Sequence, residues 1–230
     1  MKSVALLPMK ANSERVVGKN FRDFCGKPLF RWTLETLLSL DWLDSVVINT
    51  DARALLAAHG LEESDRVIIR DRKANLCGDD VSMNLIIADD IMAVDADKYL
   101  MTHVTNPLLT AEAITRAADV FASGQRDGTA DSLFSVKKFQ TRFYRVDGSP
   151  VNHDPKNLTP TQEIEPWYEE DSNLYFFTRQ SFSETGARIG QRPILFESPA
   201  LVSIDIDTPQ DWDLAVTTQR YLRERQGESQ

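Results

Sequence analysis

Short apolar segments alternate along this chain with longer segments whose apolar positions recur at helical spacing. Apolar runs predict strands at residues 3–8, 45–51, 66–70 and 98–104. Helical spacing predicts helices at residues 26–40, 52–60, 82–94 and 111–121. Strands that alternate with helices predict βαβ units, and therefore an α/β fold with a mainly parallel sheet covered on both faces.

The positions of the polar loops indicate at which edge of the sheet a ligand would bind. Ligands of open parallel sheets bind beyond the carboxyl ends of the strands. The polar loops that follow the predicted strands begin near Lys10, Asn49, Arg72 and Thr105. We therefore expect these loops to meet at one edge of the sheet.

The pattern changes after residues 131–138. Residues 139–171 are rich in Pro, Asn, Asp and Thr and lack strong periodicity, apart from a predicted hairpin near residues 143–151. An irregular insertion of this length in a compact chain is more often functional than idle. Alternation returns at residues 173–179 and 200–207, which predicts two further strands. We expect one domain over residues 1–230 with residues 139–171 as an insertion.

Two helix starts carry capping signals. Thr110 precedes the helix at 111–121, with Glu112 in its first turn. Thr208 precedes Pro209 and Asp211, a pattern typical of a capped helix with proline at its first position. Both positions predict the beginning of a helix.

Composition limits the classes of partner. The net charge of −9 argues against a broad nucleic-acid or anionic-membrane surface, although it leaves room for a basic pocket. Apolar runs fall short of the roughly 20 residues that span a bilayer, and the first residues do not resemble a secretion signal. Cys25 and Cys77 have no metal-type spacing and indicate ordinary cytosolic thiols. We expect a cytoplasmic protein with no nucleic-acid or membrane partner.

The loop after the first strand concentrates cations in this acidic chain. Lys10, Arg15 and Lys19 stand among small and polar residues in "LLPMKANSERVVGKN". Backbone N–H groups near a helix start bind phosphate oxygens, and Lys or Arg neutralises the remaining charge. The loop has neither a P-loop nor a GxGxxG pattern. The residues alone leave two interpretations open, a phosphate site and a solvated charged loop.

The segment "SIDIDTP" offers a metal site. In an extended strand Asp205 and Asp207 point to the same face, because side-chain direction repeats every two residues. Two carboxylates on one face repel unless a cation lies between them, and oxygen ligands suit Mg²⁺. The alternative is that one aspartate caps the following helix and the other faces water.

Taken in order, these motifs resemble the acylneuraminate cytidylyltransferase (CMP-sialic acid synthetase) family over nearly the whole chain. In the opening loop Lys10 stands at the family's arginine position. The other matching segments are "GKPLFRWTLE", "VVINTD", "RKANLCGDDVS", "THVTNPLL", "YEEDSNLYFF" and "SIDIDTPQD". The positions that match the family's opening and middle motifs are Pro8, Ser13, Lys19, Asn20, Arg72, Leu76, Asp79 and Ser82.

The resemblance implies a fold, a reaction and an assembly. The fold is a Rossmann-like three-layer nucleotidyltransferase fold with a loop-rich dimerisation insertion. The reaction joins CTP to a nonulosonic sugar acid, giving a CMP-sugar and pyrophosphate, with Mg²⁺ as the cofactor. The assembly is a homodimer in which residues 139–171 help complete the neighbour's sugar pocket.

The same resemblance assigns residues to roles. The nucleotide contacts are Lys10, Ser13, Arg15, Lys19, Asn20, Arg72 and Ser82. The Mg²⁺ ligands are Asp205 and Asp207, which form the catalytic set together with Lys10 and Lys19. The sugar-acid contacts are His103, Thr105, Asn106, Glu170, Tyr175 and Phe176. No general base is identified.

Several positions depart from the family's pattern. Ala11 and Asn12 replace two glycines of the opening loop, and Lys10 keeps the charge of arginine without its bidentate geometry. His103 replaces a glutamine near the sugar. The alternatives are a 3-deoxy-octulosonate cytidylyltransferase, a glycosyltransferase that uses a nucleotide sugar, and a catalytically silent nucleotide-binding homologue.

Overall fold

A seven-stranded sheet forms the centre of the computed structural model, which describes residues 2–227. Along the sheet the strands are β5 (Val67–Asp71), β4 (Ser45–Thr50), β1 (Ser3–Leu6), β6 (Lys98–Thr102), β8 (Trp167–Phe177), β7 (Ser132–Phe139) and β9 (Pro193–Glu197). Strand β8 is antiparallel to both neighbours, and every other pair is parallel. The expected α/β fold with a mainly parallel sheet is confirmed.

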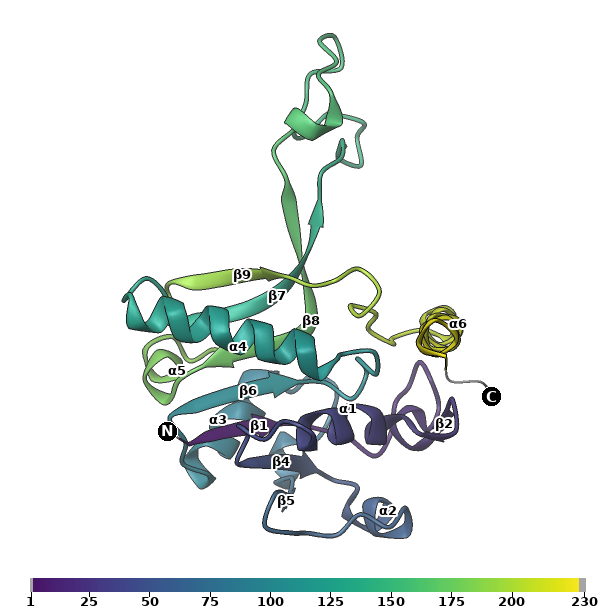
Figure 1. The fold of residues 1–230 in the computed structure, drawn as a ribbon, viewed down its shortest axis with the longest axis vertical. Helices are drawn as coiled ribbons and strands as arrows, with labels where there is room; N and C mark the ends of the chain where they lie inside the picture. The colour runs from purple at the N-terminus through teal and green to yellow at the C-terminus, as the bar shows by residue number, and fades with distance from the viewer. Residues whose placement is uncertain (1, 228–230) are drawn as a thin grey trace.

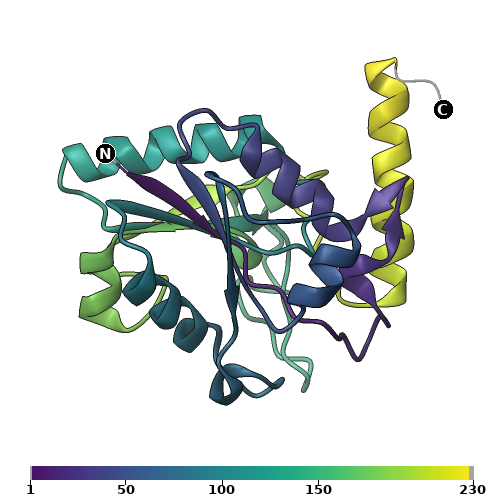
Figure 2. The same ribbon diagram turned by 90° about the horizontal axis from the view of Figure 1, so that it is seen from below.

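Helices cover both faces of this sheet (Figures 1 and 2). On one face lie α1 (Leu29–Leu38) and α4 (Ala111–Arg126), and on the other lie α3 (Met83–Ala93) and α5 (Arg179–Thr185). The remaining helices and short elements are α2 (Arg53–Ala58), α6 (Pro209–Gln226), the 3₁₀ turns η1 (Lys19–Phe21), η2 (Ala74–Leu76) and η3 (Thr161–Glu163), and the hairpin of β2 (Asp23–Phe24) and β3 (Lys27–Pro28).

The alternation of side chains along β1 explains why its sequence is apolar throughout. Ala5 packs with α1 and α4, whereas Val4 and Leu6 pack with α3. All three are fully buried, because a parallel strand covered on both faces needs apolar residues at every position. A third cluster, which includes Phe24 and Trp212, joins α6 to the small hairpin.

The predicted helix starts are confirmed. The Thr110 hydroxyl accepts a hydrogen bond from the Ala113 N–H at 3.2 Å and caps α4. Thr208 and Asp211 form a reciprocal capping box at the start of α6, with proline in its first turn. The Ser82 hydroxyl likewise accepts from the Asn84 N–H and caps α3.

The last strand of the sheet is not where alternation predicts it. Residues 200–207 do not pair in the sheet, and the edge strand is β9 instead. Ile206 and its partly buried neighbour Ile204 alternate because they pack in the cluster beneath α6, not because they belong to a strand. Strand β8 is also longer than the predicted 173–179, and helix α5 has no counterpart among the predicted elements.

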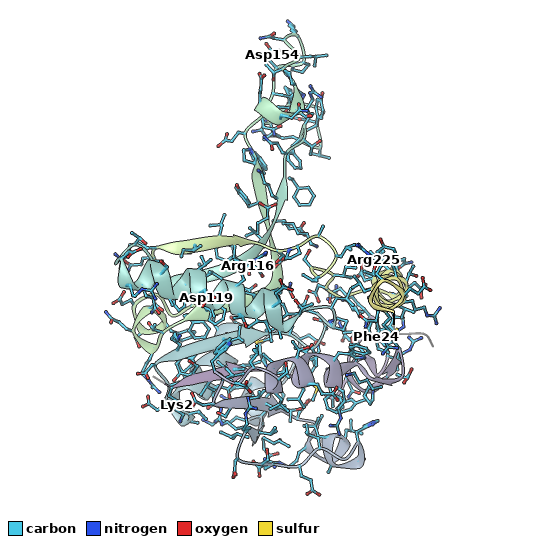
Figure 3. The ribbon with its side chains drawn as sticks, in the orientation of Figure 1. Lys2, Phe24, Arg116, Asp119, Asp154 and Arg225 are labelled. Carbon is cyan, nitrogen blue, oxygen red and sulfur yellow. The ribbon has the colours of Figure 1, made fainter. Side chains whose placement is uncertain are left out.

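Strands β7 and β8 continue past the sheet as a two-stranded stalk that carries an arm (Figure 1). Asp154 lies at the far end of the arm (Figure 3). The predicted hairpin is present, since the Val151 N–H donates to the Phe143 carbonyl at 2.9 Å. The Phe143 ring stacks on Trp167, with centroids 5.2 Å apart. The final residues of the predicted insertion belong to β8, so the irregular part ends before Trp167.

Candidate active site

The polar loops after β1, β4 and β5 meet at one edge of the sheet, as expected from their positions. The Arg72 guanidinium joins them. It donates to Oδ1 and the carbonyl oxygen of Asn49 at 3.0 and 2.8 Å, and to the carbonyl oxygen of Met9 at 3.2 Å. Burial lowers the pKa of Arg72. Because all three of its acceptors belong to the protein, Arg72 holds the loops after β1 and β4 together at this edge.

The cationic loop after β1 is folded against this edge. The Ala11 N–H donates to Oδ1 of Asp51 at 2.7 Å, and Nδ2 of Asn20 donates to the Lys10 carbonyl oxygen at 2.8 Å. Gly18 adopts φ +62°, a left-handed conformation that glycine accommodates without strain, just before η1. The loop is therefore tied at both ends, and Ser13 lies partly exposed within it.

The cations of this loop reach acidic partners from distant parts of the chain. The Lys10 ammonium pairs with Asp79, and both side chains are about half exposed. Nη2 of Arg15 lies 3.0 Å from Oδ1 of Asp207. Lys19 is buried, and its ammonium donates to the Ile206 carbonyl oxygen at 2.5 Å. The loop is thus a line of cations held in place by carboxylates and one carbonyl group.

The predicted metal pair lies directly beside Lys19. Burial raises the pKa of Asp205, and repulsion from Asp207 adds to the effect. Oδ1 of Asp205 is buried and has no hydrogen-bond partner among the described residues. Neither aspartate caps α6, because Thr208 and Asp211 do so. The alternative in which one aspartate is only a helix cap is therefore wrong.

The donor set suits Mg²⁺ better than a metal held by protein alone. Within residues 2–227 no group of three or more His, Cys, Asp or Glu side chains converges. Two carboxylates that leave further positions to water and phosphate are a usual Mg²⁺ arrangement. The buried Oδ1 of Asp205 is an acceptor without a partner among the described residues. The residues therefore fit the cofactor that the resemblance implies.

Beyond the pair, loops from β6 and β8 interlock. The Ile206 N–H donates to the Thr105 carbonyl oxygen at 2.9 Å. Nδ2 of Asn106 donates to the carbonyl oxygen of Ser172 at 3.0 Å, where Ser172 adopts φ +55° in an irregular part of β8. Oδ1 of Asn106 is buried without a partner among the described residues. Thr105 and Asn106 thus tie the segment that carries Asp205 and Asp207 to β8.

Four side chains gather on the α3 and α5 face of the sheet, next to these loops. Nη2 of Arg188 lies 3.0 Å from Oε1 of Glu170, and the Tyr175 hydroxyl donates to the same oxygen. The Arg188 guanidinium also lies 3.7 Å above the centre of the Tyr175 ring. Its Nη1 is 3.4 Å from Nε2 of His103. We name Arg188, Glu170, Tyr175 and His103 the arginine cluster.

The pKa of His103 responds both to the arginine cluster and to the cationic loop after β1. Desolvation lowers the pKa of His103 to about 3, with further lowering by the Arg188 and Lys19 charges. His103 is therefore neutral at physiological pH. Because the Arg188 guanidinium can only donate, Nε2 of His103 accepts and the ring proton is on Nδ1. His103 thus lies within the electrostatic reach of both cations.

Sequence reasoning missed Arg188 and misplaced Phe176. Arg188 follows Gly186, whose φ of +67° ends α5 and turns the chain back toward the sheet. The residues around Arg188 form no motif that would mark it as a site residue, so the sequence does not distinguish it from the arginines of the arm. Phe176 was expected to contact the sugar, but it points to the opposite face of β8 from Tyr175. There it is buried and stacks on Phe121, with centroids 5.8 Å apart, which makes it a core residue.

Comparison with known proteins identifies the family of this chain. A sequence model of the family described as cytidylyltransferase matches residues 4–213. Pseudaminic acid cytidylyltransferase of Campylobacter jejuni is 26% identical over 226 residues, covering 94% of this chain and 95% of that protein. CMP-N,N'-diacetyllegionaminic acid synthase of Legionella pneumophila is 26% identical over 220 residues, covering 93% and 94%. N-acylneuraminate cytidylyltransferase A of Danio rerio is 25% identical, covering 95% of this chain and 50% of that protein.

Solved structures share the fold. A CMP:2-keto-3-deoxy-manno-octonic acid synthetase complexed with CTP superimposes with a TM-score of 0.65 at 16% identity, covering 96% of this chain and all of that one. A 4-diphosphocytidyl-2C-methyl-D-erythritol synthase gives 0.62 at 14% identity, covering 95% and 99%. Among the helices that the structure describes, none combines the length and apolarity of a membrane span.

Proposed function

Because the chain belongs to the cytidylyltransferase family, we propose that it activates a nonulosonic, sialic-acid-like sugar with CTP. In this reaction the anomeric hydroxyl oxygen attacks the α-phosphorus and forms a new P–O bond. The bond between the α- and β-phosphates breaks, and pyrophosphate leaves with its electron pair. The hydroxyl proton passes to solvent or to a nearby base.

The arginine cluster is the observation that carries the choice of a sugar acid, nonulosonic or octulosonic, as the acceptor. In a nonulosonic acid the carboxylate is attached to the anomeric carbon, so the acid group lies next to the attacking hydroxyl. Arg188 is a cation suited to a carboxylate, and Lys19 is a cation beside the metal pair. His103 lies within the electrostatic reach of both. An acceptor with its carboxylate on Arg188 directs its hydroxyl toward the phosphate-side cations.

Relatives that cover nearly the whole chain support this acceptor class. The Campylobacter and Legionella proteins are named for pseudaminic and legionaminic acids, and the zebrafish protein for N-acylneuraminate. The octonic acid synthetase shares the fold at 16% identity, which supports the octulosonate alternative less well. Phe139, Phe143, Trp167 and Tyr168 on the arm side further suggest an apolar surface for a partner.

Mg²⁺ belongs to the same proposal. Asp205 and Asp207 would hold it, and the ion would neutralise charge on the phosphates of CTP. Lys10, Arg15 and Lys19 orient the phosphates and stabilise the charge that develops on the leaving pyrophosphate. Neutral His103 keeps an Nδ1–H donor for an acceptor oxygen. Each of these tasks is binding, orientation or charge stabilisation.

Assembly and location complete the proposal. Tyr144, Trp167 and Tyr168 are 55%, 43% and 46% exposed, which is unusual for three aromatic side chains of one projecting arm. We propose a homodimer in which this arm covers the neighbour's sugar site. Free Cys25 and Cys77 suit a reducing compartment, which supports the cytoplasm.

A matrix of substrates tests the function. Pyrophosphate release is measured with ATP, CTP, GTP and UTP against sialic, legionaminic, pseudaminic and 3-deoxy-octulosonic acids. We expect release with CTP and at least one of the three nonulosonic acids, and none without an acceptor. Release only with octulosonic acid would establish the alternative acceptor. Absence of release in every combination, while CTP still binds, would identify a silent homologue.

A further inference from the structure

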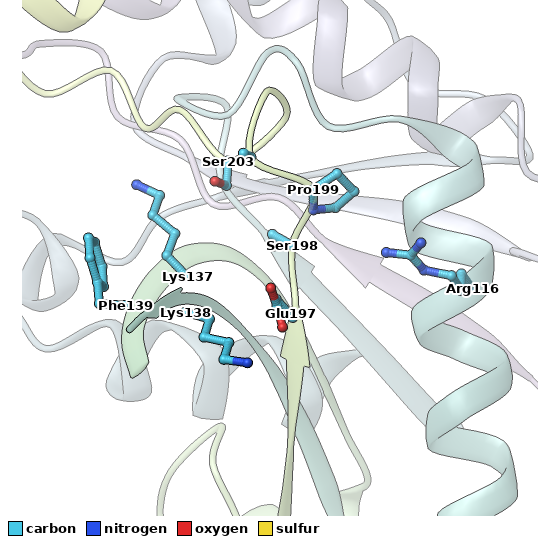
Figure 4. Close-up of a pocket in the computed structure, with 9 residues that line it drawn as sticks. Arg116, Lys137, Lys138, Phe139, Glu197, Ser198, Pro199 and Ser203 are labelled. Atoms are coloured by element: carbon cyan, nitrogen blue, oxygen red, sulfur yellow. The ribbon is translucent and has the colours of Figure 1, made fainter. Parts of the chain in front are cut away.

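A second polar pocket lies on the α4 face of the sheet, apart from the arginine cluster. Its volume is about 500 Å³, and it opens between α4, the ends of β7 and β9, and the loop that follows β9 (Figure 4). Its lining residues are Arg116, Lys137, Lys138, Phe139, Glu197, Ser198, Pro199, Ala200 and Ser203. We name it the lysine pocket. None of its residues belongs to the predicted nucleotide, metal or sugar sets.

The charge of the lysine pocket is unbalanced. The lining holds three cations, Arg116, Lys137 and Lys138, and one carboxylate, Glu197, so it carries a net charge of +2 in a chain of −9. Within residues 2–227 none of the three cations forms an ion pair or donates a side-chain hydrogen bond, whereas Lys10, Arg15 and Lys19 all have acidic partners. Lys137 and Lys138 are consecutive residues of β7, so their side chains leave the strand toward opposite faces, and Lys137 is the one that lies on the side of Ser203 (Figure 4).

Two serines provide an independent sign of a ligand. Ser203 is 1% exposed and Ser198 is 8% exposed, and both line the lysine pocket. The hydroxyl oxygens of both have no hydrogen-bond partner among the described residues. A buried hydroxyl without a partner costs free energy, so such groups are normally satisfied by protein, water or ligand. In Figure 4 the Ser203 hydroxyl points to the side on which the Lys137 side chain lies.

We propose that the lysine pocket binds a phosphate-bearing small molecule. A phosphate monoester carries a charge of about −1.5 to −2 and three acceptor oxygens, which matches a lining charge of +2 with two free hydroxyl donors. The volume exceeds what a single phosphate fills, and Phe139 and Pro199 offer apolar wall for an organic part. Inorganic phosphate, released pyrophosphate and a nucleoside monophosphate share the recognised group.

The pocket also borders the segment that carries Asp205 and Asp207. Ser203 stands two residues before Asp205 in the segment that leads to α6. An anion that engages Ser203 therefore lies two residues from the proposed metal pair. This gives the pocket a physical route to influence the proposed reaction.

Lysine footprinting tests the site locally and without an activity assay. The full-length protein is acetylated under limiting reagent with inorganic phosphate, pyrophosphate or CMP, and labelling of each lysine is read by mass spectrometry. We expect Lys137 and Lys138 to become protected, while exposed Lys2 at the opposite end of the sheet does not change. Protection by CMP alone identifies an organic phosphate, and protection by all three identifies the phosphate group itself.

Variants decide whether the pocket residues make the contacts. Calorimetry with the protecting probe should show roughly tenfold weaker binding for Lys137→Met, the loss of about one charge-assisted hydrogen bond. Ser203→Ala removes only a hydroxyl and should weaken binding about threefold or more. Lys2→Met is the control and should bind as the wild type does. If Lys137→Met unfolds at a lower temperature than the wild type, Lys138→Met is used in its place.

Two results obtained with the probes would overturn the proposal. One is unchanged labelling of Lys137 and Lys138 at probe concentrations that protect Lys10 in the nucleotide loop. The other is wild-type binding by both Ser203→Ala and a lysine variant. Protection that appears on raising protein concentration without any probe would also reject it, because the pocket would then be covered by a second copy of the chain.

Discussion

Lys19 and Asp207 are separated by 188 residues in the sequence, yet the Lys19 ammonium lies 3.5 Å from Oδ1 of Asp207. Lys19 is 7% exposed, and burial lowers its pKa while Asp207 and Asp205 oppose that shift. The buried ammonium lies between the cationic loop after β1 and the carboxylate pair, and it keeps these two parts at a fixed separation. The proposed phosphate and metal sites are therefore one unit.

The carboxylate pair gives the first prediction. Asp205→Asn and Asp207→Asn should each lower kcat by about 100-fold or more, because a ligand for the proposed Mg²⁺ is lost. Without Mg²⁺, Asp205→Asn should melt at the same or a higher temperature than the wild type. The reason is that burial raises the pKa of Asp205, so its charge disfavours the folded state at neutral pH.

Steady-state rates at limiting Mg²⁺ and thermal melts check this pair of effects. Asp213→Asn, an exposed aspartate of α6, is the matched control and should change neither. Near-wild-type rates in both variants would remove the metal assignment.

The ion pair between Lys10 and Asp79 gives the second prediction. Both side chains are about half exposed, so the pair contributes little stability and can open for a phosphate. Lys10→Met should lower kcat more than it weakens CTP binding, because its charge is needed most in the transition state. Asp79→Asn should tighten CTP binding by releasing Lys10.

Calorimetry with CTP, combined with kcat and KM, separates these effects. If Lys10→Met weakens CTP binding and turnover equally, Lys10 is a ground-state contact. Lys2→Met serves as the charge-matched control.

Arg188 gives the third prediction. Arg188→Met should raise KM for the sugar acid by roughly tenfold or more and leave KM for CTP within about twofold, as expected for the loss of a charge-assisted contact. Arg188→Lys should recover part of the loss, because lysine keeps the charge without the fork geometry. Arg192→Met, at an exposed arginine that donates to the Gly128 carbonyl, is the control. An equal rise in both KM values would instead indicate a structural role.

His103 gives a prediction about pH. Its pKa falls from 6.5 to about 3 on folding, so the unfolded chain binds more protons than the folded chain between these values. The contribution of His103 to stability is complete above pH 6.5 and is lost as the pH falls toward 3. At pH 5 the loss should be about 1–2 kcal/mol relative to pH 7.5.

Urea unfolding of the wild type and of His103→Gln at both pH values measures this difference. The variant should lose less stability than the wild type between pH 7.5 and pH 5, because glutamine does not titrate. Equal losses would show that His103 is protonated in the folded protein.

The arm gives the last prediction. Arg142 and Arg145 are the two arginines of the arm, and we expect them to meet the sugar carboxylate of the partner. Mixing an Asp205→Asn protein with an Arg142→Met/Arg145→Met protein should restore activity, provided each is inactive alone and subunits exchange. Restoration is expected because one pairing then has both an intact metal pair and an intact partner arm. Light scattering should show a dimer before mixing. A monomer that is fully active at the assay concentration would contradict the shared site.

The sequence predicts the centre of this fold better than its edge. Strands β1 and β4 are buried on both faces and therefore appear as continuous apolar runs. Strand β9 is a five-residue edge strand that is mostly exposed or half-buried, so it has no such signature. Residues 200–207 alternate because of the cluster beneath α6, which periodicity alone cannot separate from pairing in a sheet.

The candidate site likewise contains residues that the sequence predicts and residues that it does not. Lys10, Arg15 and Lys19 were predicted because they occur together in one loop, and Asp207 because its motif is compact. Arg188 was not, since its place depends on how the chain turns after Gly186. Phe176 was misassigned because a motif match gives the segment but not the face of the strand.

The position of β8 governs the order in which this protein can fold as it leaves the ribosome. Strand β8 lies between β6 and β7, so the sheet stays divided until the arm has been synthesised and the chain has returned. Lys19 must then wait for Ile206 and Asp207, which are nearly the last residues before α6. A nascent chain stopped before residue 203 therefore holds the cationic loop without Asp207, the acidic partner of Arg15 and Lys19. The proposed binding of CTP with Mg²⁺ should consequently arise only at the end of synthesis, so that it would report that the whole chain has folded.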